Sequence, residues 1–415
     1  MSLVLAGLFV LFLLMGLPIA IVIGAATMTA LNLGDVPLMV VPQQMFAGLN
    51  SFALVAVPMF VLAGDIMAQG EISKRLVAFA DSMIGFIRGG LSIVSVLAGM
   101  FFAAISGSGA ATTAAVGASL VPELKRKGYD PASAASLIAA AGTIGVVIPP
   151  SVPMIIYAVI AQVSVKELFL AGLIPGIAMG VGLIFIALIQ GYRRAYEPGT
   201  PLSLRVIVRT FLSASWGLMA PLIILGGIFS GIFTPSEAAV IAVNYAIFIS
   251  FFVYRDLTLK QFYRIVMKAG VTTAVILFVI ASSSVLSWAL ASWQVPNAIA
   301  AFALSISSNT YILLILIMML ILLTGVFLET ASALIILTPM LLPLAAQLGI
   351  GSIHFGIIIV VGLAIGMVTP PVAINLFVAS SITNLPVERI ARAVLPYLAM
   401  LIVVYLLIAF IPMFL

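Results

Sequence analysis

The chain has 415 residues, of which 64% are hydrophobic and 7% are charged, and its formal net charge is +5 at pH 7. Charged residues usually make up about 25% of a soluble domain, so this sequence has too little polar surface for a water-soluble enzyme. It contains no cysteine and a single histidine, His354, which excludes disulfides, thiolate metal sites and histidine-clustered metal sites. We therefore expect an all-α polytopic membrane protein that is not an enzyme.

The first apolar run covers residues 3–31 and carries no basic segment typical of a cleavable targeting peptide. As one helix it would be about 43 Å long, against a hydrocarbon core of about 30 Å. We predict a membrane helix that tilts or bends at Gly16-Leu17-Pro18, because proline interrupts helical hydrogen bonding.

Further apolar runs, separated by charged residues or by glycine and proline breaks, predict the remaining crossings. They are 52–69, 131–162, 168–192, 211–233, 236–254, 271–290, 356–382 and 394–412. Two other stretches, 90–122 and 310–347, predict helical hairpins. The first is too short for two crossings of roughly 20 residues each plus a turn, so we expect it to be re-entrant. The length of the second leaves both interpretations open.

Basic residues fall in clusters between these segments. Placing every cluster in the cytoplasm satisfies the positive-inside rule, with the first hairpin entering from the cytoplasm and the second from outside. The N-terminus is then cytoplasmic and the C-terminus lies on the outer side. The clusters are Lys74, Arg75 and Arg88; Lys125, Arg126 and Lys127; Arg193, Arg194, Arg205 and Arg209; Arg255, Lys260, Arg264 and Lys268; and Arg389 and Arg392.

The two halves of the chain repeat one order of elements. Residues 78–82 (AFADS) resemble 301–305 (AFALS), and each segment precedes a hairpin. Each hairpin is followed by a crossing interrupted by a proline pair, Pro149-Pro150 in one half and Pro370-Pro371 in the other. Because the halves have opposite orientations in the charge-based topology, this pattern predicts an inverted-repeat secondary transporter with broken helices.

The repeat predicts a division of the chain into two units and a linker. The first repeat covers 1–190, with scaffold helices in 1–69, an arm at 70–89, the hairpin 90–122, the broken helix 131–162 and the helix 168–192. Residues 191–235 form a linking loop and an extra transmembrane helix. The second repeat covers 236–415, with scaffold helices in 236–290, an arm at 296–308, the hairpin 310–347, the broken helix 356–382 and the helix 394–412.

Polar residues gather at the tip of the first hairpin, in Ser106-Gly107-Ser108-Gly109. Glycines let the backbone turn sharply, and backbone groups unsatisfied at membrane depth are tolerated only where protein or a polar cavity covers them. Serine hydroxyls and free carbonyls are hard oxygen ligands, so this tip predicts a Na⁺ site. The alternative is a flexible loop tip with no ligand.

The proline pairs each remove two N–H donors within a crossing and leave carbonyls unbonded. With Gly145 in one half and Gly366 and Thr369 in the other, they predict unwound stretches opposite the hairpin tips. A simple helix kink is the alternative for either motif alone.

Glu329, with Gly325, Thr330 and Ser332 around it, marks the predicted tip of the second hairpin. An ionised acid at the centre of a membrane helix costs roughly 2.5–3.5 kcal/mol on insertion scales. Three roles stay open for it: a cation ligand, a proton carrier, or an acid that accepts hydrogen bonds from hairpin N–H groups. Asp65, near the cytoplasmic end of its crossing, is interpreted as interfacial, and no fixed cationic clamp for a carboxylate is evident.

Together these motifs resemble the large membrane subunit of TRAP transporters, the tripartite ATP-independent periplasmic carriers, over nearly the whole chain. The resemblance rests on the serine-glycine tip and on four further runs: PMFVLAG at 58–64, GTIGVVIPPS at 142–151, FTPSEAA at 233–239 and VTPPVAIN at 368–375. Any one of these runs alone is a weak signal, whereas the set is specific.

The resemblance implies an elevator-type, Na⁺-coupled importer of organic acids in the bacterial inner membrane, with C4-dicarboxylates and sialic acids among the family substrates. It implies two or more coupling Na⁺ ions and no organic cofactor, and in the bacterial inner membrane the charge-based topology makes the C-terminus periplasmic. It also implies two partners, a small four-helix membrane subunit and a soluble periplasmic substrate-binding protein. Because Met1 starts the first crossing almost directly, we expect the small subunit to be a separate chain.

The hairpins and broken helices are expected to form a mobile transport domain, and the other helices a scaffold that the small subunit extends. The expected ligands of one Na⁺ are Ser106, Ser108, Gly145, Ile148 and Pro150. Those of a second Na⁺ are Gly325, Gly366 and Thr369. The organic anion is expected near Ser108, Ser151, Thr330 and Ser332.

Three alternatives remain at this stage. A carrier of the same architecture could work without a binding protein, as an exchanger or as a symporter coupled to protons through Glu329. A channel would need a continuous pore and would conduct far faster. A purely structural scaffold would tolerate substitutions at Ser108 or Thr369 without loss of transport.

Overall fold

The structure is a computed structural model that describes residues 1–69, 71–194, 196, 202–307 and 309–411. Over these residues every regular element is helical and no strand occurs. Seven of the described helices are long and apolar enough to cross a membrane, or eight if a pair bent by 66°, residues 40–49 and 52–68, forms one span. The predicted all-α, multi-span fold is therefore confirmed.

Some predicted boundaries fall outside the described residues. These are residue 70 at the start of the first arm, residues 195 and 197–201 of the linking loop, residue 308 at the end of the second arm, and residues 412–415 at the end of the chain.

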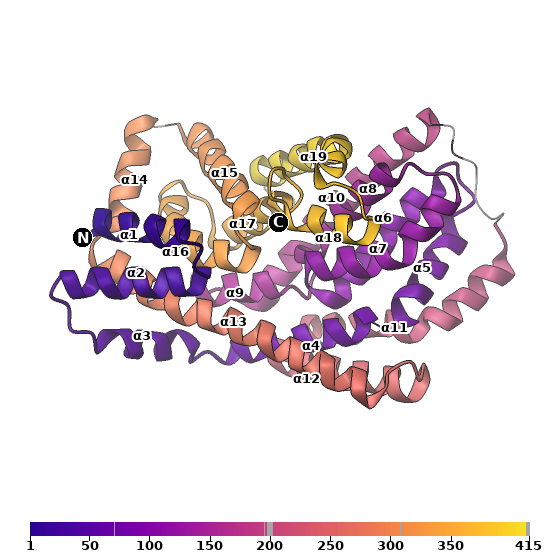
Figure 1. The fold of residues 1–415 in the computed structure, drawn as a ribbon, viewed down its shortest axis with the longest axis horizontal. Coiled ribbons are helices and arrows are strands. Elements are labelled where there is room, and N and C mark those ends of the chain that lie inside the picture. Colours follow the sequence, from indigo (N-terminus) through magenta and orange to yellow (C-terminus); the bar gives the residue numbers. More distant parts are fainter. Residues whose placement is uncertain (70, 195, 197–201, 308, 412–415) are drawn as a thin grey trace.

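The helices pack into two groups. The first, which we call the scaffold group, comprises α2 (Ile19–Leu33), α3 (Val40–Leu49), α4 (Ala56–Gln69), α11 (Leu204–Ser230), α12 (Pro235–Phe248) and α13 (Leu259–Ser292). Helix α13 contacts α2, α3 and α4, and α12 contacts α4 and α11. Figure 1 shows α3, α4, α12 and α13 along one long edge of the molecule.

The second group, which we call the hairpin group, contains both predicted hairpins and both proline-interrupted segments. Its helices are α6 (Gly90–Ser106), α7 (Gly109–Arg126), α8 (Pro131–Thr143), α9 (Val152–Ala161), α10 (Val165–Arg193), α15 (Thr310–Phe327), α16 (Thr330–Gln347), α17 (Ser352–Gly366), α18 (Ile374–Thr383) and α19 (Val387–Phe410). Figure 1 shows α15 and α19 along the edge opposite the scaffold group.

Two shorter helices bridge the groups. Helix α5 (Glu71–Ile84) packs on α6 of the hairpin group and on α11 of the scaffold group. Helix α14 (Val295–Ile306) packs on α16 and on α13 in the corresponding way. These are the segments that the sequence predicts as arms.

The N-terminal run differs from the single helix that the sequence predicts. The chain breaks at the expected place, but α1 (Ser2–Leu14) and α2 are separate helices that pack against each other. Gly16 adopts a left-handed conformation with φ +76°, and Pro18 precedes α2 without a donor N–H. The two residues together reverse the chain instead of bending one helix.

Both proline pairs lie in gaps between helices. After α8 the chain forms a short 3₁₀ turn, η2 (Ile144–Val146), and α9 begins only beyond Pro149-Pro150. In the second half α17 ends at Gly366 and α18 begins beyond Pro370-Pro371. Both Pro-Pro peptide bonds are cis.

The hairpins pack across the two halves of the sequence. Helix α7 from the first half contacts α18 from the second, and α16 from the second half contacts α9 from the first. In the same manner α19 contacts α8, and α10 contacts α17. Each broken segment is therefore enclosed by elements from both halves.

Helices α10 and α19 lie in the hairpin group, although the sequence analysis assigns them to the scaffold. Helix α10 contacts α6, α17 and α19. Its glycines allow this close packing, because a Cβ atom at Gly172 would lie 2.5 Å from the Cε of Met154, and one at Gly176 would clash with Ile148. The small residues on α10 thus bring it against the first broken segment.

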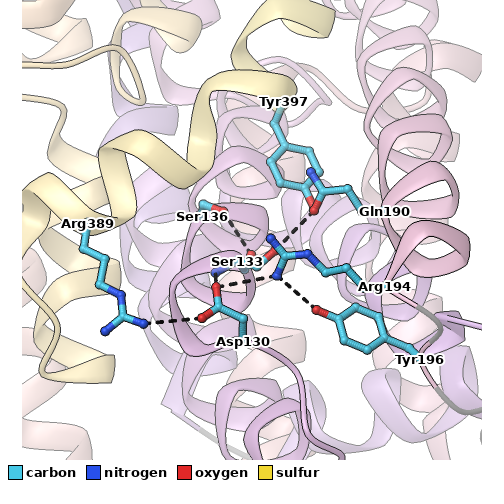
Figure 2. Close-up of polar contacts among 8 residues, drawn as sticks. All are labelled: Asp130, Ser133, Ser136, Gln190, Arg194, Tyr196, Arg389 and Tyr397. Atoms are coloured by element: carbon cyan, nitrogen blue, oxygen red, sulfur yellow. Dashed lines mark hydrogen bonds and ion pairs between the residues drawn. The ribbon is translucent and has the colours of Figure 1, made fainter.

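A polar cluster ties three helix ends together at one end of the hairpin group (Figure 2). The Asp130 carboxylate accepts a 2.9 Å hydrogen bond from the N–H of Ser133 at the start of α8. It also forms ion pairs with Arg194 at the end of α10, at 3.6 Å, and with Arg389 near the start of α19, at 3.5 Å. Gln190 accepts hydrogen bonds from Ser133 and from Tyr397 of α19, so the cluster extends inward.

Candidate functional site

A cavity of about 340 Å³ lies between the scaffold group and the hairpin group. Both hairpin tips and residues beside both Pro-Pro segments form one wall, and α4 and α13 form the other. The polar side chains along these walls are those of Asp65, Ser106, Ser108, Lys268, Thr272, Glu329 and Thr330. Two segments about 220 residues apart in the sequence thus meet at one site.

The first hairpin tip packs closely on the first broken segment. The hydroxyls of Ser106 and Thr112 lie 2.8 Å apart, and Thr112 donates a 2.8 Å hydrogen bond to the carbonyl of Ser108. A Cβ atom at Gly145 would lie 2.8 Å from that same carbonyl oxygen, so only glycine permits the approach.

The other predicted members of this group lie nearby. A Cβ at Gly107, in the turn of the tip, would lie 2.6 Å from the carbonyl oxygen of Pro150. Ile148 belongs to the same segment, but its side chain packs against Gly176 of α10 instead of lining the cavity. Hydroxyl and carbonyl oxygens therefore gather here, a donor set that fits a hard monovalent cation.

The second predicted cation group also comes together. A Cβ at Gly366 would lie 2.5 Å from the carbonyl carbon of Gly325, so the end of α17 and the end of α15 touch through their backbones. Thr369 follows directly, with its N–H bonded to the Gly366 carbonyl at 3.0 Å and its hydroxyl bonded to the Ile365 carbonyl at 2.9 Å.

The four residues expected near the organic anion separate into two pairs. Ser108 and Thr330 line the cavity, and the buried Thr330 hydroxyl has no hydrogen-bond partner among the described residues. Ser151 and Ser332 do not line it. Ser151 is fully buried and caps α9, accepting from the N–H of Met154 and donating to the Val146 carbonyl.

Glu329 caps the helix of the second hairpin tip. Its carboxylate accepts a 3.0 Å hydrogen bond from the N–H of Ala331 and a 3.3 Å bond from the N–H of Ser332 at the start of α16. Negative charge at a helix N-terminus is stabilised by the helix dipole as well as by these bonds. Of the three roles left open by the sequence, the structural one matches the observed hydrogen bonds.

The capping hydrogen bonds predict different effects for the substitutions Glu329→Gln and Glu329→Ala. We expect glutamine to keep the Na⁺-driven uptake that the sequence resemblance implies within about threefold of the native rate, because an amide oxygen still accepts the capping bonds. Loss of a cap costs about 1 kcal/mol, so alanine is expected to lower uptake about fivefold or more. Uptake into proteoliposomes, normalised to incorporated protein, checks both values, and a glutamine variant as impaired as the alanine variant would favour a role for the charge itself.

Asn375 is a site residue that sequence reasoning did not single out. It lies at the start of α18, is fully buried, and donates a 3.2 Å hydrogen bond to the Ala139 carbonyl of α8. Its side-chain oxygen has no partner among the described residues. This amide joins the two broken segments, and its position four residues after the second Pro-Pro pair is the signal that marks it.

An ion pair between Asp65 and Lys268 was also missed. Asp65 of α4 and Lys268 of α13 approach to 3.0 Å, and both line the cavity. Position in the chain alone places Asp65 at a membrane interface and Lys268 in a cytoplasmic cluster. The two are 203 residues apart, so only the packing of α4 on α13 reveals the pair.

The described residues contain no group of three or more His, Cys, Asp or Glu side chains placed to hold a metal ion. Helical hairpins and interrupted helices from both sequence halves surround one cavity that carries several polar side chains, an arrangement typical of membrane permeases. Comparison with known proteins makes the assignment specific. The chain belongs to the DctM family, described as "Tripartite ATP-independent periplasmic transporter, DctM component", which it matches over residues 6–414.

Several similar proteins are named as TRAP permeases. The chain is 40% identical to the isethionate TRAP transporter permease protein DctMQ of Oleidesulfovibrio alaskensis, over 99% of this chain and 65% of that protein. It is 39% identical to the C4-dicarboxylate TRAP transporter large permease protein DctM of Pseudomonas aeruginosa, over 89% of this chain and 86% of that protein. It is 38% identical to the sialic acid TRAP transporter large permease protein SiaM of Vibrio cholerae, over 90% of this chain and 87% of that protein.

These relatives confirm the family that the sequence motifs indicate, and they confirm that the chain is a permease component and not an enzyme. Among solved structures, the fold is similar to the YdaH transporter of Alcanivorax borkumensis. The TM-score is 0.67 at 15% identity, and the match covers 98% of both chains. That likeness concerns the fold alone.

Proposed function

We propose that the chain is the large permease subunit of a Na⁺-coupled importer of an organic acid in the bacterial inner membrane, with a cytoplasmic N-terminus and a periplasmic C-terminus. One observation carries the proposal: both hairpin tips and residues beside both Pro-Pro segments line a single cavity. Half-helix ends that meet in this way expose carbonyl oxygens and N–H groups to a bound ion and substrate.

Two Na⁺ sites account for the two close approaches. At the first, the oxygens of Ser106, Ser108 and Thr112 lie within hydrogen-bond distance of one another, next to Gly145 and Pro150. At the second, Gly325 and Gly366 touch, and Thr369 follows. Bound cations supply positive charge near the anion. Among the described residues of the hairpin group that line the cavity, none has a basic side chain that could supply it.

The packing supports the proposal of an elevator movement of the hairpin group against the scaffold group. Helices from both sequence halves enclose each broken segment, which favours movement of the hairpin group as one body. The cavity lies at the boundary of the two groups, and α5 and α14 connect them as arms. This proposal includes three further points. Both hairpins are re-entrant, both interrupted helices are transmembrane, and the two halves of the chain form an inverted repeat.

The substrate class is an organic anion, with C4-dicarboxylates and sialic acid as the leading candidates, because the named relatives are permeases for such anions. The proposed partners are a separate small four-helix membrane subunit and a soluble periplasmic binding protein that delivers the substrate. A carrier that works without a binding protein is not favoured, because the family is defined as part of a tripartite transporter.

The test is uptake into proteoliposomes that contain the permease with its small subunit, with the binding protein added outside. Radiolabelled succinate, isethionate and N-acetylneuraminate serve as probes. We expect one of them to accumulate under an inward Na⁺ gradient and faster at inside-negative potential, since each net charge gains about 2.3 kcal/mol per 100 mV. Equal uptake with choline replacing Na⁺ would overturn the coupling, and uptake that is unaffected by omitting the binding protein would overturn the tripartite assignment.

A further inference from the structure

The charged side chains along the cavity are unevenly distributed between its walls. Glu329 lies on the hairpin wall, whereas Asp65 and Lys268 lie on the scaffold wall. Among the described residues that line the cavity, Lys268 is the only one with a basic side chain. An organic anion that enters between the tips therefore meets positive side-chain charge only on the scaffold side.

Asp65 holds Lys268 in place but does not occupy all of its hydrogen-bond donors. Its Nζ lies 3.0 Å from Oδ1 of Asp65, whose side chain is 13% exposed, while the Lys268 side chain is 62% exposed. An ammonium group has three donors, and the described residues occupy one of them. The carboxylate of Asp65 thus fixes the position of an ammonium group that keeps free donors at the cavity.

We propose that Lys268 binds the anionic group of the substrate from the scaffold wall, and that Asp65 is its positioning residue. This inference deepens the proposed function and rests on it for the identity of the ligand as an organic anion. The contact supplies the fixed cation that no motif in the sequence indicates. Because both residues belong to the scaffold group, it exists only while the hairpin tips face this part of α4 and α13.

The first experiment measures the electrostatics of the cavity without knowing the substrate. The chain has no cysteine, so Thr272→Cys places a single thiol on the cavity wall, one helical turn from Lys268. In the purified complex, we compare its rates of modification by anionic sulfonatoethyl and cationic trimethylammonioethyl methanethiosulfonates. Lys268→Gln in this background is expected to lower the anionic-to-cationic rate ratio about tenfold, because it leaves Asp65 unpaired.

Asp65→Asn is expected to move that ratio in the opposite direction, upward by about tenfold, because it leaves the cation without its partner. A merely structural ion pair predicts that both variants disturb the cavity in the same direction. Lys260→Gln is the matched control, since Lys260 lies on the same helix but not at the cavity, and its ratio should stay within twofold. An unchanged ratio in Lys268→Gln, or equal shifts in both variants, overturns the proposal.

The second experiment uses the acid that shows Na⁺-dependent uptake in the proteoliposome assay. Lys268→Gln should raise its KM about tenfold, Asp65→Asn should raise it by a smaller factor because the ammonium group is no longer held at the cavity, and Lys268→Arg should keep a near-native KM. If a single variant fails to assemble, the neutral double variant Asp65→Asn/Lys268→Gln replaces it and should again raise KM. A wild-type complex without Na⁺-dependent uptake contradicts the proposed function, whereas native uptake with an unchanged KM in Lys268→Gln contradicts this inference alone.

Discussion

Gly107→Ala is expected to reduce Na⁺-driven uptake by at least about tenfold. Gly107 turns the first hairpin tip with φ +60°, a conformation that costs an alanine roughly 1–2 kcal/mol. The new Cβ would also lie 2.6 Å from the carbonyl oxygen of Pro150, and overpacking of this kind costs about 1–3 kcal/mol more. Each 1.4 kcal/mol is a factor of ten, so displacement of the tip from the broken segment should dominate the result.

Gly128→Ala is the matched control for this variant. Gly128 has φ +77°, so alanine meets the same backbone strain there, but no atom lies within 4 Å of its Cβ position. We expect uptake within about twofold of native, measured in proteoliposomes at equal amounts of assembled complex. Equal losses in the two variants would show that backbone strain, and not the approach to Pro150, limits the transporter.

Gly366→Ala is the second variant with a large expected effect, and it should act on Na⁺. A Cβ there would lie 2.5 Å from the carbonyl carbon of Gly325, so the ends of α15 and α17 must separate. Alanine favours a helix over glycine by about 1 kcal/mol, so helix propensity cannot explain a loss. We expect the half-saturating Na⁺ concentration for uptake to rise about tenfold or more, with a smaller change in substrate KM measured at saturating Na⁺.

Gly270→Ala provides the corresponding control in α13. That glycine is also helical, and no atom lies within 4 Å of its Cβ position. The Na⁺ dependence of this variant should match the native protein. If Gly366→Ala changes uptake without any change in Na⁺ dependence, the second cation site must lie elsewhere.

The parts of this molecule that sequence reasoning predicts well are those encoded in local backbone chemistry. Gly107 and the two proline pairs lie in breaks between helices, so the hairpin turn and both gaps lie where expected. The same local signals, a turn or an interruption, are the basis on which both candidate cation groups are predicted, and their binding of Na⁺ stays a prediction. Predicting these turns and interruptions requires no knowledge of contacts between residues that are distant in the sequence.

The parts that sequence reasoning misses depend on tertiary packing. The reversal at Gly16 and Pro18 could not be told from a bend, because the difference lies in whether α1 packs on α2. Likewise, α10 and α19 belong to the hairpin group because of the helices they pack against, which the sequence does not indicate. The Asp65–Lys268 pair joins residues that local patterns place near two separate loops, and charge spacing along the chain gives no signal for it.

The exchange of partners between the sequence halves has a consequence for biogenesis. Helix α9 gains its neighbour α16, and α7 its neighbour α18, only after most of the polypeptide has been synthesised. In a fragment that stops after α10, the faces of α7 and α9 that contact α18 and α16 in the full chain would be uncovered. A second molecule would have to cover them. The hairpin group can therefore be completed only after the second half of the chain has been synthesised.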